Sequence, residues 1–158
     1  MSTRYLCLLI ALAAASALAQ NSNATTTTQT SEFSFPLVGL ASTETIGVNL
    51  INLASASSSG TAASCTGTVA FLSAAGTTIG TAASFTLASN AVTSATLAFS
   101  SSGLTAPRGL IRAVVTSTQT SGVPCDLSFS LNTYDTSSGV THVFLTGSGS
   151  QPGPTFGR

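Results

Sequence analysis

The sequence predicts an all-β protein, built as a single antiparallel, Ig-like β-sandwich of about seven to eight strands with one disulfide. Beyond the first residues no segment repeats its apolar residues at the helical period, whereas short runs alternate apolar with small polar residues. Turn signals rich in Gly, Ser and Pro separate these runs at regular intervals. Cys65 and Cys125 each share a strand face with apolar neighbours, so both are expected to point into the core.

The N-terminal residues 1–19 have the pattern of a secretory signal peptide. Arg4 precedes an apolar run, and Ala17-Leu18-Ala19 forms a cleavage signature that makes Gln20 the expected first residue of the mature chain. The apolar run is short for a membrane helix and a polar segment follows it, so we expect no membrane span. We therefore expect a secreted protein, located in the periplasm, on the cell surface or outside the cell.

Composition divides the mature chain into three parts. Residues 20–32 are Thr-rich and are expected to form a flexible arm. Residues 33–146 hold the alternating runs and are expected to form the sandwich. Residues 147–158 are rich in Gly and Pro and are expected to be a disordered tail.

The expected strands begin with 33–40, which Pro36 confines to a sheet edge because proline cannot donate to the ladder. In the next strand, 45–50, the apolar phase shifts at Ile51, which predicts a bulge or a strand end.

The middle of the chain supplies four more strands. Residues 65–73 and 78–87 alternate apolar with small polar residues and flank a short turn, which predicts a hairpin. Residues 91–99 form another strand, and 109–117 are almost continuously apolar, which is typical of a central strand.

The last two strands, 125–134 and 140–146, flank a turn in which Asp135 accepts an Asx hydrogen bond and Gly139 takes a positive φ. If Tyr134 pairs with Val140, then His142 lies opposite Asn132 on the outer face. A shift of one residue would instead turn His142 and Phe144 inward. We favour the first register because it buries two aliphatic residues, Val143 and Leu145.

Few side chains offer reactive chemistry, so we expect no enzyme, no catalytic residues, no metal and no cofactor. A Ser-His-Asp site needs a presented nucleophile, and the sequence has no GxSxG elbow. One His and no CxxC pair are too few for a metal site. One of the two arginines, Arg108 or Arg112, is expected to form a structural ion pair with Asp126 or Glu44 at a sheet margin.

The chain has four Arg residues and no Lys, and its formal net charge is zero. A protein that binds nucleic acid needs a basic face, so nucleic acid is excluded as a partner. Ser and Thr hydroxyls supply most of the polar surface, which would tolerate close packing against copies of the chain or against a cell wall.

Four runs carry a resemblance to short exported proteins of acidobacteria, and they lie within residues 35–146. These runs are "FPLVGLASTETIGVNLINLA", "CTGTVAFLSAAGTTIG", "RGLIRAVVTS" and "PCDLSFSLNTYDTSSGVTHVFL". The chain resembles that group in its V-G-L opening, its Cys strand, its I-R-A strand and its P-C strand. The resemblance implies a bacterial envelope or extracellular setting and an Ig-like sandwich, with no catalytic residues.

These observations favour an exported, non-catalytic structural or cell-surface interaction domain that self-assembles through strand edges or the N-terminal arm. The alternative is a monomeric extracellular module that binds polysaccharide or another envelope component. Asn132, Tyr134 and His142 would then form its surface-binding face.

Overall fold

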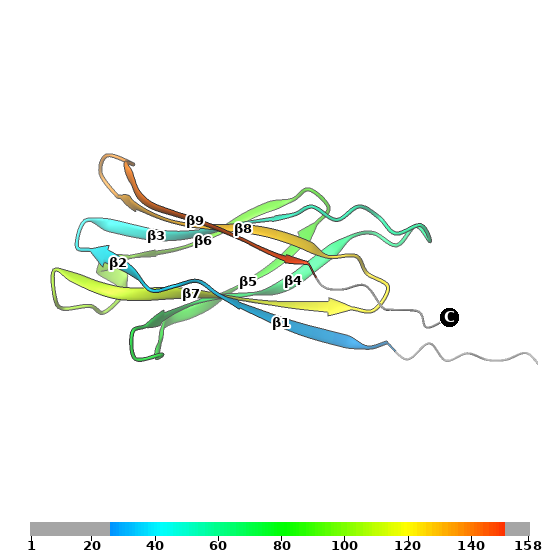
Figure 1. The fold of residues 1–158 in the computed structure, drawn as a ribbon, viewed down its shortest axis with the longest axis horizontal. Coiled ribbons are helices and arrows are strands. Elements are labelled where there is room, and N and C mark those ends of the chain that lie inside the picture. The colour runs from blue at the N-terminus through cyan, green and yellow to red at the C-terminus, as the bar shows by residue number, and fades with distance from the viewer. Residues whose placement is uncertain (1–25, 151–158) are drawn as a thin grey trace, which may run out of the picture.

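The computed structural model describes residues 26–150 and consists of β-strands with one short 3-10 turn, η1 (Figure 1). In this range the strands are β1 (Thr28–Ser34), β2 (Val38–Ala41), β3 (Glu44–Asn52), β4 (Ser64–Ser73), β5 (Thr78–Ala88), β6 (Val92–Ala98), β7 (Arg108–Thr120), β8 (Asp126–Asp135) and β9 (Thr141–Ser150). The turn η1 spans Phe99–Ser101. No helix among the described residues has the length and apolar character needed to cross a membrane.

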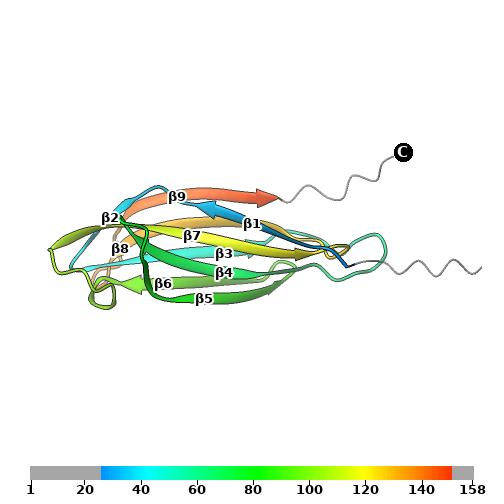
Figure 2. The same cartoon turned by 90° about the horizontal axis from the view of Figure 1, so that it is seen from below.

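The strands form two antiparallel sheets that pack face to face (Figures 1 and 2). One sheet has the order β1-β7-β4-β5, and β2 pairs with β7 beyond the end of β1. The other sheet has the order β6-β3-β8-β9. The predicted antiparallel sandwich is confirmed, with nine strands in the described range instead of seven or eight. The additional strand arises because the expected strand at 33–40 is split around Pro36 into β1 and β2.

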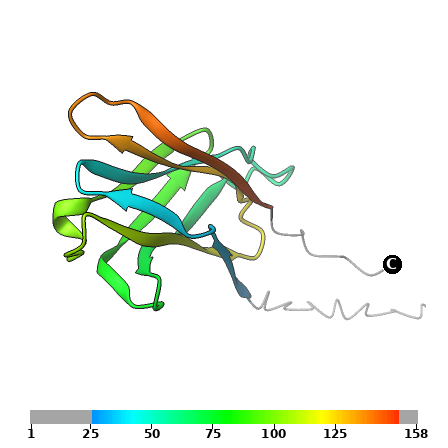
Figure 3. The same ribbon diagram turned by 60° about the vertical axis from the view of Figure 1, so that its left-hand side comes forward.

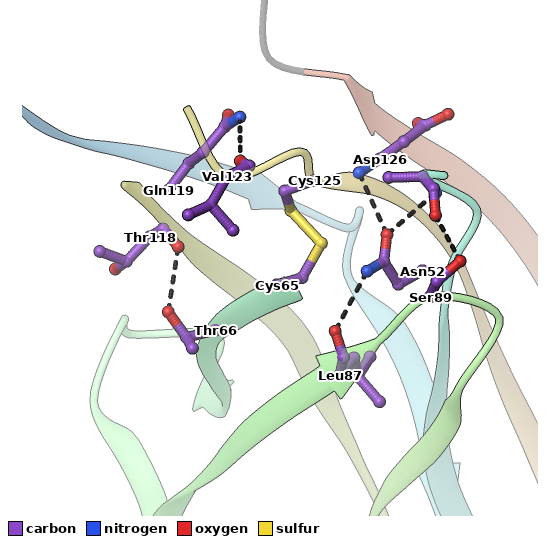
Figure 4. Close-up of a disulfide and its surroundings, with 11 residues drawn as sticks. Asn52, Cys65, Thr66, Leu87, Ser89, Thr118, Gln119, Val123, Cys125 and Asp126 are labelled. Atoms are coloured by element: carbon purple, nitrogen blue, oxygen red, sulfur yellow. Dashed lines mark hydrogen bonds between the residues drawn. A yellow bond between two sulfur atoms is a disulfide. The ribbon is translucent and has the colours of Figure 1, made fainter. Parts of the chain in front are cut away.

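The core lies between the sheets, and alternation predicted its inward residues on β3 and β8. In the expected strand 33–40 the alternation changes phase after Phe35, so Leu37 is exposed and Leu40 is buried. The largest fully buried apolar side chains of the core are Leu40, Ile46, Leu50, Ile111, Leu127 and Leu131. Cys65 of β4 and Cys125, directly before β8, form the predicted disulfide with a Cα–Cα distance of 5.1 Å (Figure 4). Because β4 and β8 belong to different sheets, this bond joins the two layers.

The flexible arm predicted for residues 20–32 is wrong for its second half. Residues from Thr28 onward form β1, which pairs with β7 from Thr28↔Thr120 to Ser34↔Val114. Composition indicates how much apolar surface a segment can bury. An edge strand can be ordered by backbone hydrogen bonds to one neighbouring strand, and Thr is common in extended backbone. Residues 20–25 lie outside the described range.

The disordered tail predicted from residue 147 is also wrong at its start. Gly147–Ser150 belongs to β9 and pairs with the first residues of β8. Gly147 is required there because a side chain would collide with the rings of Phe33 and Phe129. Here glycine marks a close approach of strands from the two sheets, which composition cannot distinguish from disorder. Residues 151–158 lie outside the described range.

The phase shift predicted at Ile51 marks a strand end, because β3 ends at Asn52, but it produces no bulge. The inward series Ile46, Val48 and Leu50 continues to Asn52, which is fully buried. A polar residue occupies the position where the pattern required an apolar one.

Candidate functional site

The outer face of the β6-β3-β8-β9 sheet carries two of the three residues predicted to form a binding face. Asn132 and Tyr134 alternate with the buried residues Leu131 and Thr133, so they point away from the core. Asn132 pairs with Gly47 on β3, and a Cβ atom at Gly47 would lie 3.1 Å from Asn132 Oδ1 and 3.8 Å from Tyr134 Cε1. The missing side chain at Gly47 therefore lets both residues lie across β3.

The register of the β8–β9 hairpin differs from the predicted one and removes His142 from this face. Tyr134 pairs with Thr141, and the register shifts between Tyr134 and Thr133, which pairs with Val143. His142 is the additional residue of the resulting bulge, and Phe144 takes the place opposite Asn132. The prediction that Val143 and Leu145 pack toward the core is confirmed.

The turn explains why the bulge occurs. Asp135 N–H donates to Val140 O, and Gly139 has a φ of 72° as predicted. Asp135 Oδ1 accepts hydrogen bonds from the backbone N–H groups of Ser137 and Ser138, which is the predicted Asx arrangement. This closed turn fixes the start of β9, so the strand needs one additional residue to bring its apolar side chains to the core.

His142 instead contacts Glu44, a residue that the sequence analysis did not single out for this role. His142 Nδ1 hydrogen-bonds to Glu44 Oε1, and Glu44 Oε2 accepts the backbone N–H of Ala41 at 2.7 Å. The Glu44 side chain is 5% exposed, whereas that of His142 is 47% exposed. Burial by itself raises the pKa of Glu44, but the Ala41 N–H, His142 and the nearby Arg108 together hold this pKa below its ordinary value.

The predicted ion pair of Arg108 or Arg112 with a carboxylate is wrong for the described residues. Within the range 26–150 neither arginine lies within ion-pair distance of a carboxylate, and Glu44 instead contacts the imidazole of His142. The guanidinium of Arg108 lies over Gly39, where no side chain separates it from the backbone of β2. Arg108 is thus near enough to lower the pKa of Glu44 without forming a bonded pair with it.

A shallow groove of about 250 Å³ lies farther along the same outer face. Its side chains come from all four strands of the sheet and include Asn49, Ile51, Val92, Ser128, Ser130 and Thr146. The amide of Asn49 links this groove to the Asn132 region, because Asn49 Nδ2 donates to Asn132 Oδ1 at 3.4 Å. Groove, amide groups and Tyr134 thus form one continuous surface across the sheet.

Two residues that matter for the site were missed. Phe144 is 64% exposed on the outer face, but the sequence analysis did not include it in the predicted binding face. Asn52 is buried and donates from Nδ2 to Leu87 O at 3.1 Å, while its Oδ1 accepts the N–H groups of Ala54 and Asp126 (Figure 4). The sequence did contain a signal for Asn52. It is a polar residue at the next inward position after the apolar series Ile46, Val48 and Leu50.

Among the described residues, no group of three or more His, Cys, Asp and Glu side chains could hold a metal ion. Comparison of the chain with protein-family models, with curated proteins and with solved structures returned no significant match.

Proposed function

We propose that the chain is an exported, non-catalytic interaction domain that associates with copies of itself through the free edge of β9. The observation that carries this proposal is the composition of that edge. β9 borders the four-stranded sheet over ten residues, and none of them is Asp, Glu, Lys, Arg or Pro. An unpaired strand edge presents backbone N–H and C=O groups that can pair with another chain.

The other borders of the sandwich are interrupted or shorter than β9. The β1 and β2 edge carries Glu32 and is broken at Pro36. β5 contains a register shift in its pairing with β4, and Gly80 within it has a φ of 67°. β6 has no charged residue or proline, but it spans seven residues against ten in β9. Proteins commonly protect their sheet edges with charges, prolines and bulges. β9 has a bulge at His142, but over residues 143–150 it is the longest regular border without such protection.

The pairing that we propose is antiparallel, between the β9 strands of two copies related by a two-fold axis. Figure 3 shows β9, in orange to red, at the border of its sheet. Its register on β8 is continuous from Ser150 to Val143, so this part of the edge is regular enough to pair. Val140 and Phe144 are 56% and 64% exposed beside this edge, and pairing would remove apolar surface from water. Without the signal peptide and its Arg4, the exported chain has three Arg against four acidic residues, a net charge of −1, so little electrostatic repulsion opposes the approach of two copies.

Two further observations support export and the choice of β9. The Cys65–Cys125 bond is typical of proteins in an oxidising compartment, in agreement with the signal-peptide pattern at residues 1–19, which lie outside the described range. The N-terminal arm is the weaker route to assembly, because residues from Thr28 onward already pair with β7.

The test compares the same substitution on two edges. Thr146 of β9 and Thr86 of β5 are both exposed threonines. In a two-fold β9 pair, Thr146→Lys brings like charges close together, which opposes pairing. Light scattering coupled to size-exclusion chromatography should show concentration-dependent dimers for the oxidised wild type and for Thr86→Lys, and monomers for Thr146→Lys. A wild type that stays monomeric at high concentration, or equal effects of the two variants, would overturn the proposal.

A further inference from the structure

We infer that the outer face of the β6-β3-β8-β9 sheet binds an extended, uncharged polysaccharide. This face extends to β9 and shares Phe144 and Thr146 with the proposed edge contact, but sugar binding does not require self-association. The inference rests on the exposed ring of Phe144 beside the half-buried Tyr134, on a line of amide and hydroxyl groups, on the groove and on the absence of Asp, Glu, Lys and Arg from this part of the face.

The aromatic side chains supply a surface on which sugar rings can pack. Phe144 is 64% exposed and lies opposite Asn132, while Tyr134 lies diagonally from Phe144 on the neighbouring strand. Pyranose rings expose apolar C–H faces, and an aromatic ring offers a rigid apolar surface of matching size. Tyr134 adds a hydroxyl group that can hydrogen-bond to the same ligand.

A line of hydrogen-bonded side chains crosses the three strands β6, β3 and β8. Ser94 Oγ donates to Asn49 Oδ1 at 2.7 Å, and Asn49 Nδ2 donates to Asn132 Oδ1. These bonds orient the two amide side chains. The side chains therefore lose little further conformational freedom when a ligand binds. Amides and hydroxyls both donate and accept, which matches the alternating donors and acceptors of sugar hydroxyl groups.

The groove extends this surface along the strands. From the Thr45–Tyr134 pair to the Ile51–Ser128 pair the face covers six residue steps of β3, or about 20 Å at the usual rise per residue. Ile51 and Val92 provide apolar contact in the groove, and Ser128, Ser130 and Thr146 provide hydroxyl groups around it. A surface of this length suits a chain of several sugar rings better than a single small molecule.

The lack of charged side chains on this face favours some classes of polymeric ligand over others. Between those two residue pairs, the four strands place no Asp, Glu, Lys or Arg side chain on the outer face. An acidic polysaccharide or a nucleic acid would need cationic partners there. An extended peptide would be expected at a sheet edge, where it can form backbone hydrogen bonds. The uncharged polar face therefore favours a neutral polysaccharide.

The test is affinity electrophoresis of the full oxidised chain in gels containing soluble dextran, mannan or xyloglucan, with alginate as the acidic comparison. We expect retardation by at least one neutral polymer and none by alginate. Phe144→Ala and Asn132→Ala should each weaken binding about three- to tenfold, the range expected for one lost aromatic or polar contact. Leu110→Ala is the matched control, because Leu110 is 50% exposed on β7 of the other sheet.

The inference is overturned if no neutral polymer binds, if alginate binds equally well, or if Leu110→Ala weakens binding as much as Phe144→Ala. Circular dichroism and thermal unfolding of each variant verify that the fold is retained. Asn132 lies on the interior strand β8, away from the free edge, so Asn132→Ala should leave self-association unchanged. Loss of sugar binding and loss of self-association are thereby distinguished.

Discussion

The two ends of β3 each hold a buried polar residue, but they are stabilised in different ways. At the first residue, the Glu44 carboxylate accepts the N–H of Ala41 and contacts His142. At the last residue, the neutral amide of Asn52 bonds to three backbone groups from separate segments, beside the Cys65–Cys125 bond (Figure 4). The Asn52 end should therefore be stable over a wide pH range, whereas the Glu44 end depends on a charge.

The largest effect is expected from removal of the disulfide at the Asn52 end. The bond joins residues 60 positions apart, and a loop of that length corresponds to about 4 kcal/mol in the chain-entropy model. The double variant Cys65→Ala, Cys125→Ala should lose about that free energy of unfolding, measured by urea titration. An unchanged free energy would show that the covalent link contributes nothing to the difference between the two ends.

Replacement of Asn52 should have the next largest effect. Asn52→Ala leaves the N–H groups of Ala54 and Asp126 and the carbonyl of Leu87 without this partner in a buried place, at a cost of about 3 kcal/mol. Asn49→Ala is the matched control, because Asn49 lies on the outer face of the same strand. Its cost should be below about 1 kcal/mol. Equal costs in chemical denaturation would contradict the account of Asn52.

At the other end, Glu44→Ala should cost about 2 kcal/mol at neutral pH, because a buried hydrogen bond to a charged group is lost. Glu44→Gln should cost less, since the amide oxygen can still accept the Ala41 N–H. The pKa of Glu44 is lowered in the folded protein, so its contribution is complete above about pH 4.3, the ordinary value, and is lost as the pH falls below it.

The pH dependence separates this end from the Asn52 end. Wild-type stability should therefore fall in acid more steeply than that of Glu44→Gln, measured as the urea midpoint between pH 7 and pH 3. Parallel curves for the two proteins would mean that the carboxylate is not what makes this end sensitive to acid.

The smallest effect is expected at the exposed turn that follows β8. Hydrogen bonds from the Ser137 hydroxyl and from the N–H and hydroxyl groups of Ser138 hold the pKa of Asp135 well below its usual range. Asp135→Ala should destabilise the protein less than Glu44→Ala, because Asp135 is exposed to solvent. A thermal melting temperature lower than that of Glu44→Ala would place the acid-sensitive element in the turn instead.

How far the sequence predicts the fold is seen by comparing β4 with β9. The alternation of Cys65, Val69 and Phe71 is local and identified both the strand and its inward face, as the structure confirms. In β9 the alternation was equally clear, but the pairing depended on the geometry of the turn, so His142 was placed incorrectly opposite Asn132, where the structure has Phe144. Local patterns define a strand face, whereas register also depends on residues that the pattern does not contain.

The candidate site was only partly predictable for the same reason. Asn132 and Tyr134 were identified because they are outward residues of a strongly alternating strand. His142 and Glu44 are in contact although they are 98 positions apart in the sequence. The residues around either one do not predict this contact. Similarly, residues 28–32 of β1 were assigned to the flexible arm because their ordering comes from β7, which is distant in sequence.

The proposed self-association can be tested most directly by amide hydrogen exchange of the wild-type chain at low and high concentration. Pairing through β9 would protect backbone N–H groups in residues 141–150 as concentration rises, because those groups gain partners in the second copy. The account predicts that this segment gains protection while residues 78–88 of β5 do not. Exchange in β9 that is independent of concentration, or protection that arises at β5 instead, would contradict it.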